Sequence, residues 1–105
     1  MRNLAALMTS QDTGAIATVM VWGRRAAEIV RRFFRRLGSD KFEVEEGKIL
    51  VGEIVNNERI VDQVSIGFEG RNSIAIHCHG NPLIVSEITK IVEAEGCEVV
   101  RPEVL

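Results

Sequence analysis

His77, Cys78 and His79 stand together, and their residue types are typical of metal binding or catalysis. A strand would place the two histidines on one face and Cys78 on the other, so that only two ligands could meet a metal ion. The sequence holds no third histidine, and Cys97 would have to reach round to the same face. We therefore predict no metal site, and interpret these residues as histidines at a strand end beside a buried thiol.

The same residues make a poor nucleophilic pair. A cysteine nucleophile needs a base within hydrogen-bond reach, but on a strand the neighbouring histidines point away from Cys78. The chain also lacks the phosphate loop G-x-x-x-x-G-K-[ST] and the dinucleotide fingerprint G-x-G-x-x-G. Catalysis is left uncertain, and a non-catalytic domain is favoured. We interpret Cys78 and Cys97 as reduced, buried thiols of a cytoplasmic protein, with a disulfide between them as the less favoured alternative.

The segment around these residues predicts a strand that runs directly into a helix. Residues 74–78 form an apolar run, and His79 and Gly80 form a turn. Asn81 is a good N-cap, and Pro82 suits the first helical turn. A helix N-terminus gathers backbone N–H groups and partial positive charge, which can hold an anion. The pattern predicts either a binding site or a tight strand-to-helix joint.

Six arginines form a second candidate surface in a chain of net charge −2. They lie within residues 24–36 with one acid, Glu28. A helix over residues 24–37 would put the apolar side chains on one side and the arginines on the other. That face could contact an RNA backbone, although a solvated face or an acidic partner explains it equally well. The candidate residues are Arg24, Arg25, Arg31, Arg32, Arg35 and Arg36.

The elements that must position these residues fit one domain over residues 1–105. The chain is 46% hydrophobic and 27% charged, which is typical of a soluble globular protein. It has no apolar run long enough to span a bilayer and no signal-peptide pattern at its N-terminus. We therefore expect no membrane association.

The periodicity predicts an α+β fold with the order β-β-α-β-β-β-α-β, a mostly antiparallel sheet and two helices packed on it. A hairpin turn is expected at residues 55–58, and an acidic connector at residues 40–47. The expected strands cover residues 4–8, 15–22, 48–54, 59–68, 73–78 and 97–100, and the expected helices cover residues 24–37 and 82–95. Taken alone, the run at residues 4–8 could equally begin a helix.

Several local strings resemble those of a known family. Residues 4–23 align without a gap with an apolar strand, a T-P-P-G-type turn and a strand reading G-I-A-I-x-R-x-S-G. Residues 51–54 and 60–68 resemble the hairpin G-x-I…V-D-E-V-x-V-x-x-F. Residues 74–84 resemble V-E-x-x-C-H-G-G-x-x-V, and residues 97–105 resemble A-R-x-A-x-P-G-E-F. On these motifs the chain resembles the N-terminal domain of the tRNA-modification GTPase family TrmE, also called MnmE.

The resemblance implies a domain that homodimerises and binds a one-carbon donor like 5-formyltetrahydrofolate near the dimer interface. In the family a helical domain with an inserted GTPase follows, and the whole acts with a flavoprotein on the tRNA wobble uridine. The helical and GTPase domains are absent from this chain, which fits both a fragment and a stand-alone relative.

The chain departs from the family where the resemblance implies folate contacts. The family's arginine falls at Met20 and its glutamate at Ala75; the G-E-D stretch is shortened at residues 69–73, and Ser10-Gln11 replaces the two prolines. Burying the polar edges of a pterin unpaired costs roughly 1–3 kcal/mol each. The resemblance therefore implies weak or absent folate binding. The candidate ligand-binding positions are Met20, Ala75, His79, Gly80 and Asn81.

Three hypotheses follow. The first is a TrmE N-terminal-like dimerisation and binding module of tRNA wobble-uridine modification with a degenerate folate site, whose dimer surface is a sheet edge or a helix face. The second is retained binding of 5-formyltetrahydrofolate or another small anionic ligand at the turn after the strand. The third is an RNA-binding module that uses the arginine face.

Overall fold

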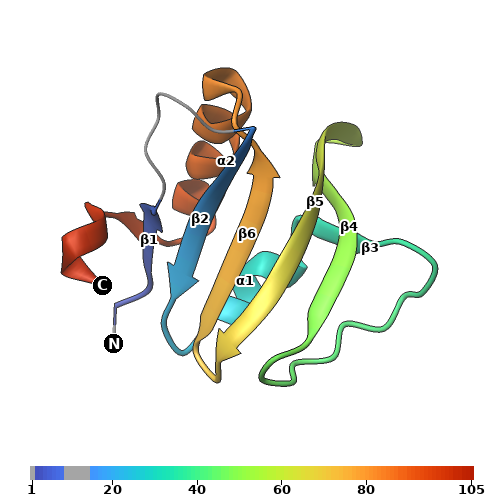
Figure 1. Cartoon of the computed structure of the whole chain (residues 1–105), viewed down its shortest axis with the longest axis horizontal. Helices are drawn as coiled ribbons and strands as arrows, with labels where there is room; N and C mark the ends of the chain where they lie inside the picture. Colours follow the sequence, from blue (N-terminus) through green and yellow to red (C-terminus); the bar gives the residue numbers. More distant parts are fainter. Residues whose placement is uncertain (1, 9–14) are drawn as a thin grey trace.

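One mixed, mostly antiparallel sheet organises the chain, and both α-helices cover the same face of it (Figure 1). The computed structural model describes residues 2–8 and 15–105. The strand order is β3-β4-β5-β6-β2-β1-β7, and of the strand pairs in these residues only β1–β7 is parallel. The predicted α+β fold class is confirmed. The elements are β1 (Leu4–Leu7), β2 (Ile16–Trp22), α1 (Ala26–Arg31), β3 (Phe34–Arg36), β4 (Ile49–Asn56), β5 (Arg59–Gly70), β6 (Ser73–His79), α2 (Pro82–Ala94), β7 (Glu98–Val99) and the 3₁₀ turn η1 (Pro102–Val104).

The prediction of one helix over residues 24–37 is wrong. The helix α1 ends at Arg31, and Phe34–Arg36 form the strand β3, which pairs antiparallel with β4. Phe34 is buried and Arg35 is exposed, so the residues also fit the alternation of a strand. A helix of this length is marginal by itself, and pairing with β4 outweighs its continuation. The element order gains one strand, and the arginines no longer share a helix face.

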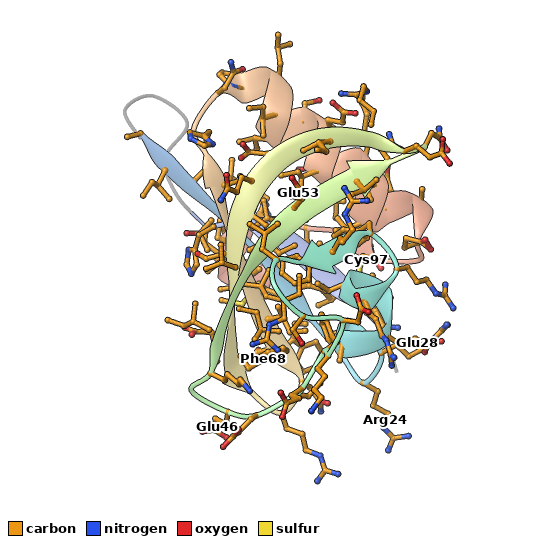
Figure 2. All side chains as sticks on the ribbon, turned by 90° about the vertical axis from the view of Figure 1, so that its right-hand side faces the viewer. Arg24, Glu28, Glu46, Glu53, Phe68 and Cys97 are labelled. Carbon is orange, nitrogen blue, oxygen red and sulfur yellow. The ribbon has the colours of Figure 1, made fainter. Side chains whose placement is uncertain are left out.

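Side-chain alternation separates the two faces of the sheet. Val19, Ile66 and Ile76 lie on the helix-covered face and are fully or almost fully buried. They form one core with residues of α1 and α2, among them Ile29 and Ile88. Figure 2 views the molecule from the β3 edge, with both helices on one side of the sheet. In the described part of the chain, the opposite face therefore carries no helix.

An aromatic cluster fixes the long connector between β3 and β4. The Phe42 ring lies 6.0 Å from the Phe34 ring and 5.8 Å from the Phe68 ring, both edge to face. Phe68 is almost fully buried, and Figure 2 labels it. The Phe42 ring and a hydrogen bond of 2.8 Å from the Gly47 N–H to the Phe68 carbonyl thus attach the connector to the core, while its acids Glu45 and Glu46 remain exposed.

Two local predictions about turns are confirmed. Asn57 and Glu58 join β4 to β5 with φ values of 52° and 68°, as a two-residue type I′ hairpin turn requires. At the start of α2, the Asn81 side-chain oxygen accepts a hydrogen bond of 2.8 Å from the Leu83 N–H, and Pro82 occupies the first helical position. Within residues 2–8 and 15–105, no helix is long and apolar enough to cross a membrane.

Candidate functional site

The joint between β6 and α2 is fixed by a residue that sequence reasoning missed, Asp62 of β5. One oxygen of this buried carboxylate accepts the His79 backbone N–H at 2.8 Å, and the other lies 2.7 Å from His79 Nδ1. Asp62 occupies an inward position of β5, in alternation with Val64 and Ile66. A buried carboxylate needs a hydrogen-bond partner. An aspartate among the inward-facing apolar residues of a predicted strand could therefore have indicated this contact from the sequence.

This contact orients the His79 imidazole. Because the carboxylate accepts only, the ring proton of neutral His79 belongs on Nδ1, which leaves Nε2 as an acceptor. The His79 side chain is 67% exposed, so this acceptor is open to solvent or to a ligand. The joint therefore places one oriented imidazole beside Gly80 and Asn81, two other predicted ligand-binding positions.

The two histidines contact different strands. His77 Nδ1 lies 3.0 Å from Thr18 Oγ1 on β2, whereas His79 contacts Asp62 on β5. Among the residues that the structure describes, no three potential metal ligands gather at one place. The geometry thus supports separate hydrogen-bonding roles for the histidines.

Both cysteines are buried free thiols, as predicted. Burial raises the pKa of Cys78 to about 11, with a further contribution from the negative charge of Asp62. Burial also raises the pKa of Cys97 to about 11. Reactive cysteines need a lowered pKa and access to solvent. These two thiols instead suit packing in the core.

The positions Met20 and Ala75, far apart in sequence, are direct cross-strand partners on β2 and β6. They belong to a row of residues that the register aligns across five strands on the face without helices. Every member of the row is apolar or small, so the arginine and the glutamate that the resemblance implies are both replaced. The Glu69 carboxylate lies nearby, because one of its oxygens would be 3.4 Å from a Cβ added at Gly67. The row consists of Ile49, Gly67, Ala75, Met20 and Ala6.

Large apolar side chains are exposed around this row. Ile16 and Ile49 are 63% and 67% exposed, and Val51 and Trp22 are 49% and 37% exposed. Alternation places all four on the face without helices, because their strand neighbours Ala17, Val21 and Leu50 are buried in the core. We call the row together with these four residues the open sheet face.

The arginines are mostly paired with acids. Glu28 lies 2.9 Å from Arg25 and 3.0 Å from Arg32, and the hydrogen bond from Arg25 lowers the pKa of Glu28. Arg35 lies 2.9 Å from Glu53, and Arg36 lies 3.7 Å from Glu43. Arg24 points away from the body of the molecule (Figure 2), and neither it nor Arg31 pairs with an acid among the described residues. Less positive charge is therefore free than the sequence count indicates.

Comparison with known sequences decides the family. The profile described as "GTP-binding protein TrmE N-terminus" matches residues 3–102. The chain belongs to this TrmE N-terminal family. Proteins named tRNA modification GTPase MnmE are 32% identical in Bacillus thuringiensis (strain Al Hakam), 28% in Bacteroides thetaiotaomicron and 27% in Flavobacterium psychrophilum. These alignments cover 93–94% of the chain but only 23% of each relative. The resemblance inferred from the motifs is confirmed.

Proposed function

We propose that this TrmE N-terminal domain is a dimerisation module in tRNA wobble-uridine modification, and that two copies associate through the open sheet face. The MnmE relatives are named as tRNA modification GTPases, which supports the process. By analogy with the family, helical and GTPase domains and a flavoprotein would act with the module. The single observation that carries dimerisation is the exposed apolar surface of the sheet.

The open sheet face suits a two-fold interface. Contiguous exposed apolar surface commonly marks an interaction site, and a two-fold dimer brings the same patch of both copies together. The small residues Gly67 and Ala75 keep the middle of the row low, between the exposed Ile49 and the partly exposed Met20, and Ala6 ends the row beyond Met20. Ala75 and Ala6 are each only 1% exposed, so a second copy would bury chiefly the large exposed side chains around the row.

The sheet edges are less suitable, although a sheet edge was one of our expectations. The edge strand β3 has three residues and carries Arg35 and Arg36, and the opposite edge strand β7 has two residues. Short, charged edges resist pairing with another strand. The observed edges thus support association through the open sheet face.

Size-exclusion chromatography with light scattering over a range of concentrations tests this proposal. We expect a dimer for the purified chain and a shift towards monomer for Ile49→Glu and Val51→Glu. Leu83→Glu is the matched control, because Leu83 is 79% exposed but lies on α2. A chain that stays monomeric at every concentration, or a dimer indifferent to Ile49→Glu, would refute the proposal.

Binding of 5-formyltetrahydrofolate is a second candidate, because Met20 and Ala75 lie side by side on the open sheet face. Neither side chain can pair with the polar pterin edge, so we expect weak binding. Calorimetry should detect little heat with the natural chain and more with Met20→Arg. Equal heats for both chains would argue against this location.

RNA binding through the arginines is a third candidate, supported by Arg24 and Arg31, which form no ion pair with residues 2–8 or 15–105. Fluorescence anisotropy with tRNA should show an affinity that falls steeply with salt. The double variant Arg24→Gln, Arg31→Gln should weaken that affinity. An unchanged affinity would remove the idea.

A further inference from the structure

A cavity of about 560 Å³ lies between α2, the strands β1 and β2, and the C-terminal segment that follows β7. Small-molecule sites typically have volumes of about 300–1,000 Å³ and mostly apolar walls. Much of the wall here is aliphatic. The lining includes Ala5, Leu7, Ala17, Val19, Val85 and Val99.

Two cations from different elements line the same cavity. Lys90 comes from α2, is exposed, and forms no ion pair with a described residue. Arg101 comes from the C-terminal segment, and its one ion pair with a described residue is to Glu103, at 3.3 Å, where both side chains are largely exposed. No acidic residue is among the described residues that line the cavity. Its charged groups therefore favour an anion.

The polar groups beside these cations also favour an anion. The Ser86 hydroxyl lines the cavity and forms no hydrogen bond within the described part of the chain. Gly80 and Pro82 also line it, so the N-terminal end of the α2 dipole, which is partly positive, lies at the cavity. Donors and positive charge thus border an aliphatic wall.

We propose that this cavity binds a small amphiphilic carboxylate, a molecule with an aliphatic body and one anionic group. The aliphatic body lies against Val19, Val85 and Val99, where its burial from water stabilises the complex. The carboxylate lies between Lys90 and Arg101, because a guanidinium and an ammonium give charge-assisted hydrogen bonds to its oxygens. Ser86 supplies a further donor.

Calorimetry with decanoate and its neutral analogue decanol tests the charge requirement. We expect decanoate to bind more tightly than decanol. The double variant Lys90→Gln, Arg101→Gln should lower the affinity for decanoate by about tenfold or more and leave that for decanol nearly unchanged. Arg24→Gln is the matched control for loss of surface charge, because Arg24 does not line the cavity. Equal affinities for the two probes, or no loss in the double variant, would overturn the proposal.

Blocking the cavity tests its location. Val99 is 39% exposed and lines the cavity, so Val99→Trp should fill it without disturbing the core and should abolish decanoate binding. Val104→Trp is the control, because Val104 is also exposed but does not line the cavity. Ile49→Glu, which targets the dimer, should bind decanoate as the natural chain does. Binding that survives Val99→Trp, or that is lost equally in Val104→Trp, would place the ligand elsewhere and refute the site.

Discussion

Residues 24–37 and residues 74–95 both contain apolar residues at helical spacing, yet they fold differently. The second region forms β6 and then α2, a helix of 13 residues that begins at the Asn81 cap. The first region forms α1, a helix of six residues without a side-chain cap, and then the strand β3. Local sequence signals determine the secondary structure of the second region, whereas pairing with another strand determines that of the first.

The difference arises from a residue of β4, the strand that pairs with β3. An added Cβ at Gly52 of β4 would lie 2.3 Å from the Arg35 carbonyl oxygen and 2.6 Å from the Phe34 ring. Glycine at this position therefore allows β3 to approach β4 closely enough to pair. No residue within 24–37 indicates this close approach of the two strands, because the glycine that permits it lies in β4.

Gly52→Ala should break the pairing that distinguishes the first region. The new methyl group cannot be accommodated without moving backbone, so we expect a loss of about 3 kcal/mol in the free energy of unfolding. Urea denaturation followed by circular dichroism measures this loss. Amide exchange at Leu37, whose N–H donates to the Val51 carbonyl of β4 at 3.0 Å, should accelerate at the same time.

Gly70→Ala is the matched control for this prediction. Gly70 also lies in a strand of the sheet, but an added Cβ there would meet no atom within 4 Å. We expect a much smaller change in stability. Similar losses for the two variants would mean that strand propensity, and not the close approach to β3, explains the effect.

Asp62→Ala tests a side-chain contact between the second region and the distant strand β5. It leaves the His79 backbone N–H and Nδ1 without their carboxylate, and loss of such a partner costs about 2 kcal/mol. Urea denaturation should show this loss. Glu46→Ala, at an exposed acid of the connector, should show almost none. Equal effects would mean that Asp62 does not stabilise the joint.

The two regions also show which features can be predicted from the sequence. The cap at Asn81, the hairpin turn at residues 55–58 and the buried thiols were predictable, because each depends on neighbouring residues or on residue type. The strand β3 and the Asp62–His79 contact depend on which residues the register brings together. The pairing of Met20 with Ala75 likewise needed the register of β2 and β6. Most strands are predictable from the sequence alone, but β3 and the pairing partners of the strands are not.

The thiol of Cys97 should make the packing of α2 sensitive to high pH. Cys97 follows α2, its N–H donates to the Val92 carbonyl at 3.0 Å, and burial raises its pKa from 9.0 to about 11. The neutral thiol is therefore favoured in the fold, and this stability is lost as the pH rises from about 9 to about 11.

At about pH 10 the expected loss is about 1.4 kcal/mol relative to about pH 8. Urea denaturation of the natural chain and of Cys97→Ala at both pH values measures it. The groups that titrate in both proteins cancel in this comparison, so the natural chain should lose more stability than the variant. Equal losses would show that the pKa of Cys97 is not raised by the fold.

Asn81→Ala should give the smallest of these effects, and it tests whether local signals really fix the second region. Loss of the hydrogen bond from the Leu83 N–H to the cap should cost about 1 kcal/mol in the free energy of unfolding. Asn81→Ser keeps an oxygen at the cap and should restore most of the stability. Because Val85, Ile88 and Val92 remain packed against the sheet, α2 should persist in both variants. A loss as large as that of Gly52→Ala would instead mean that the cap, and not packing, holds α2 in place.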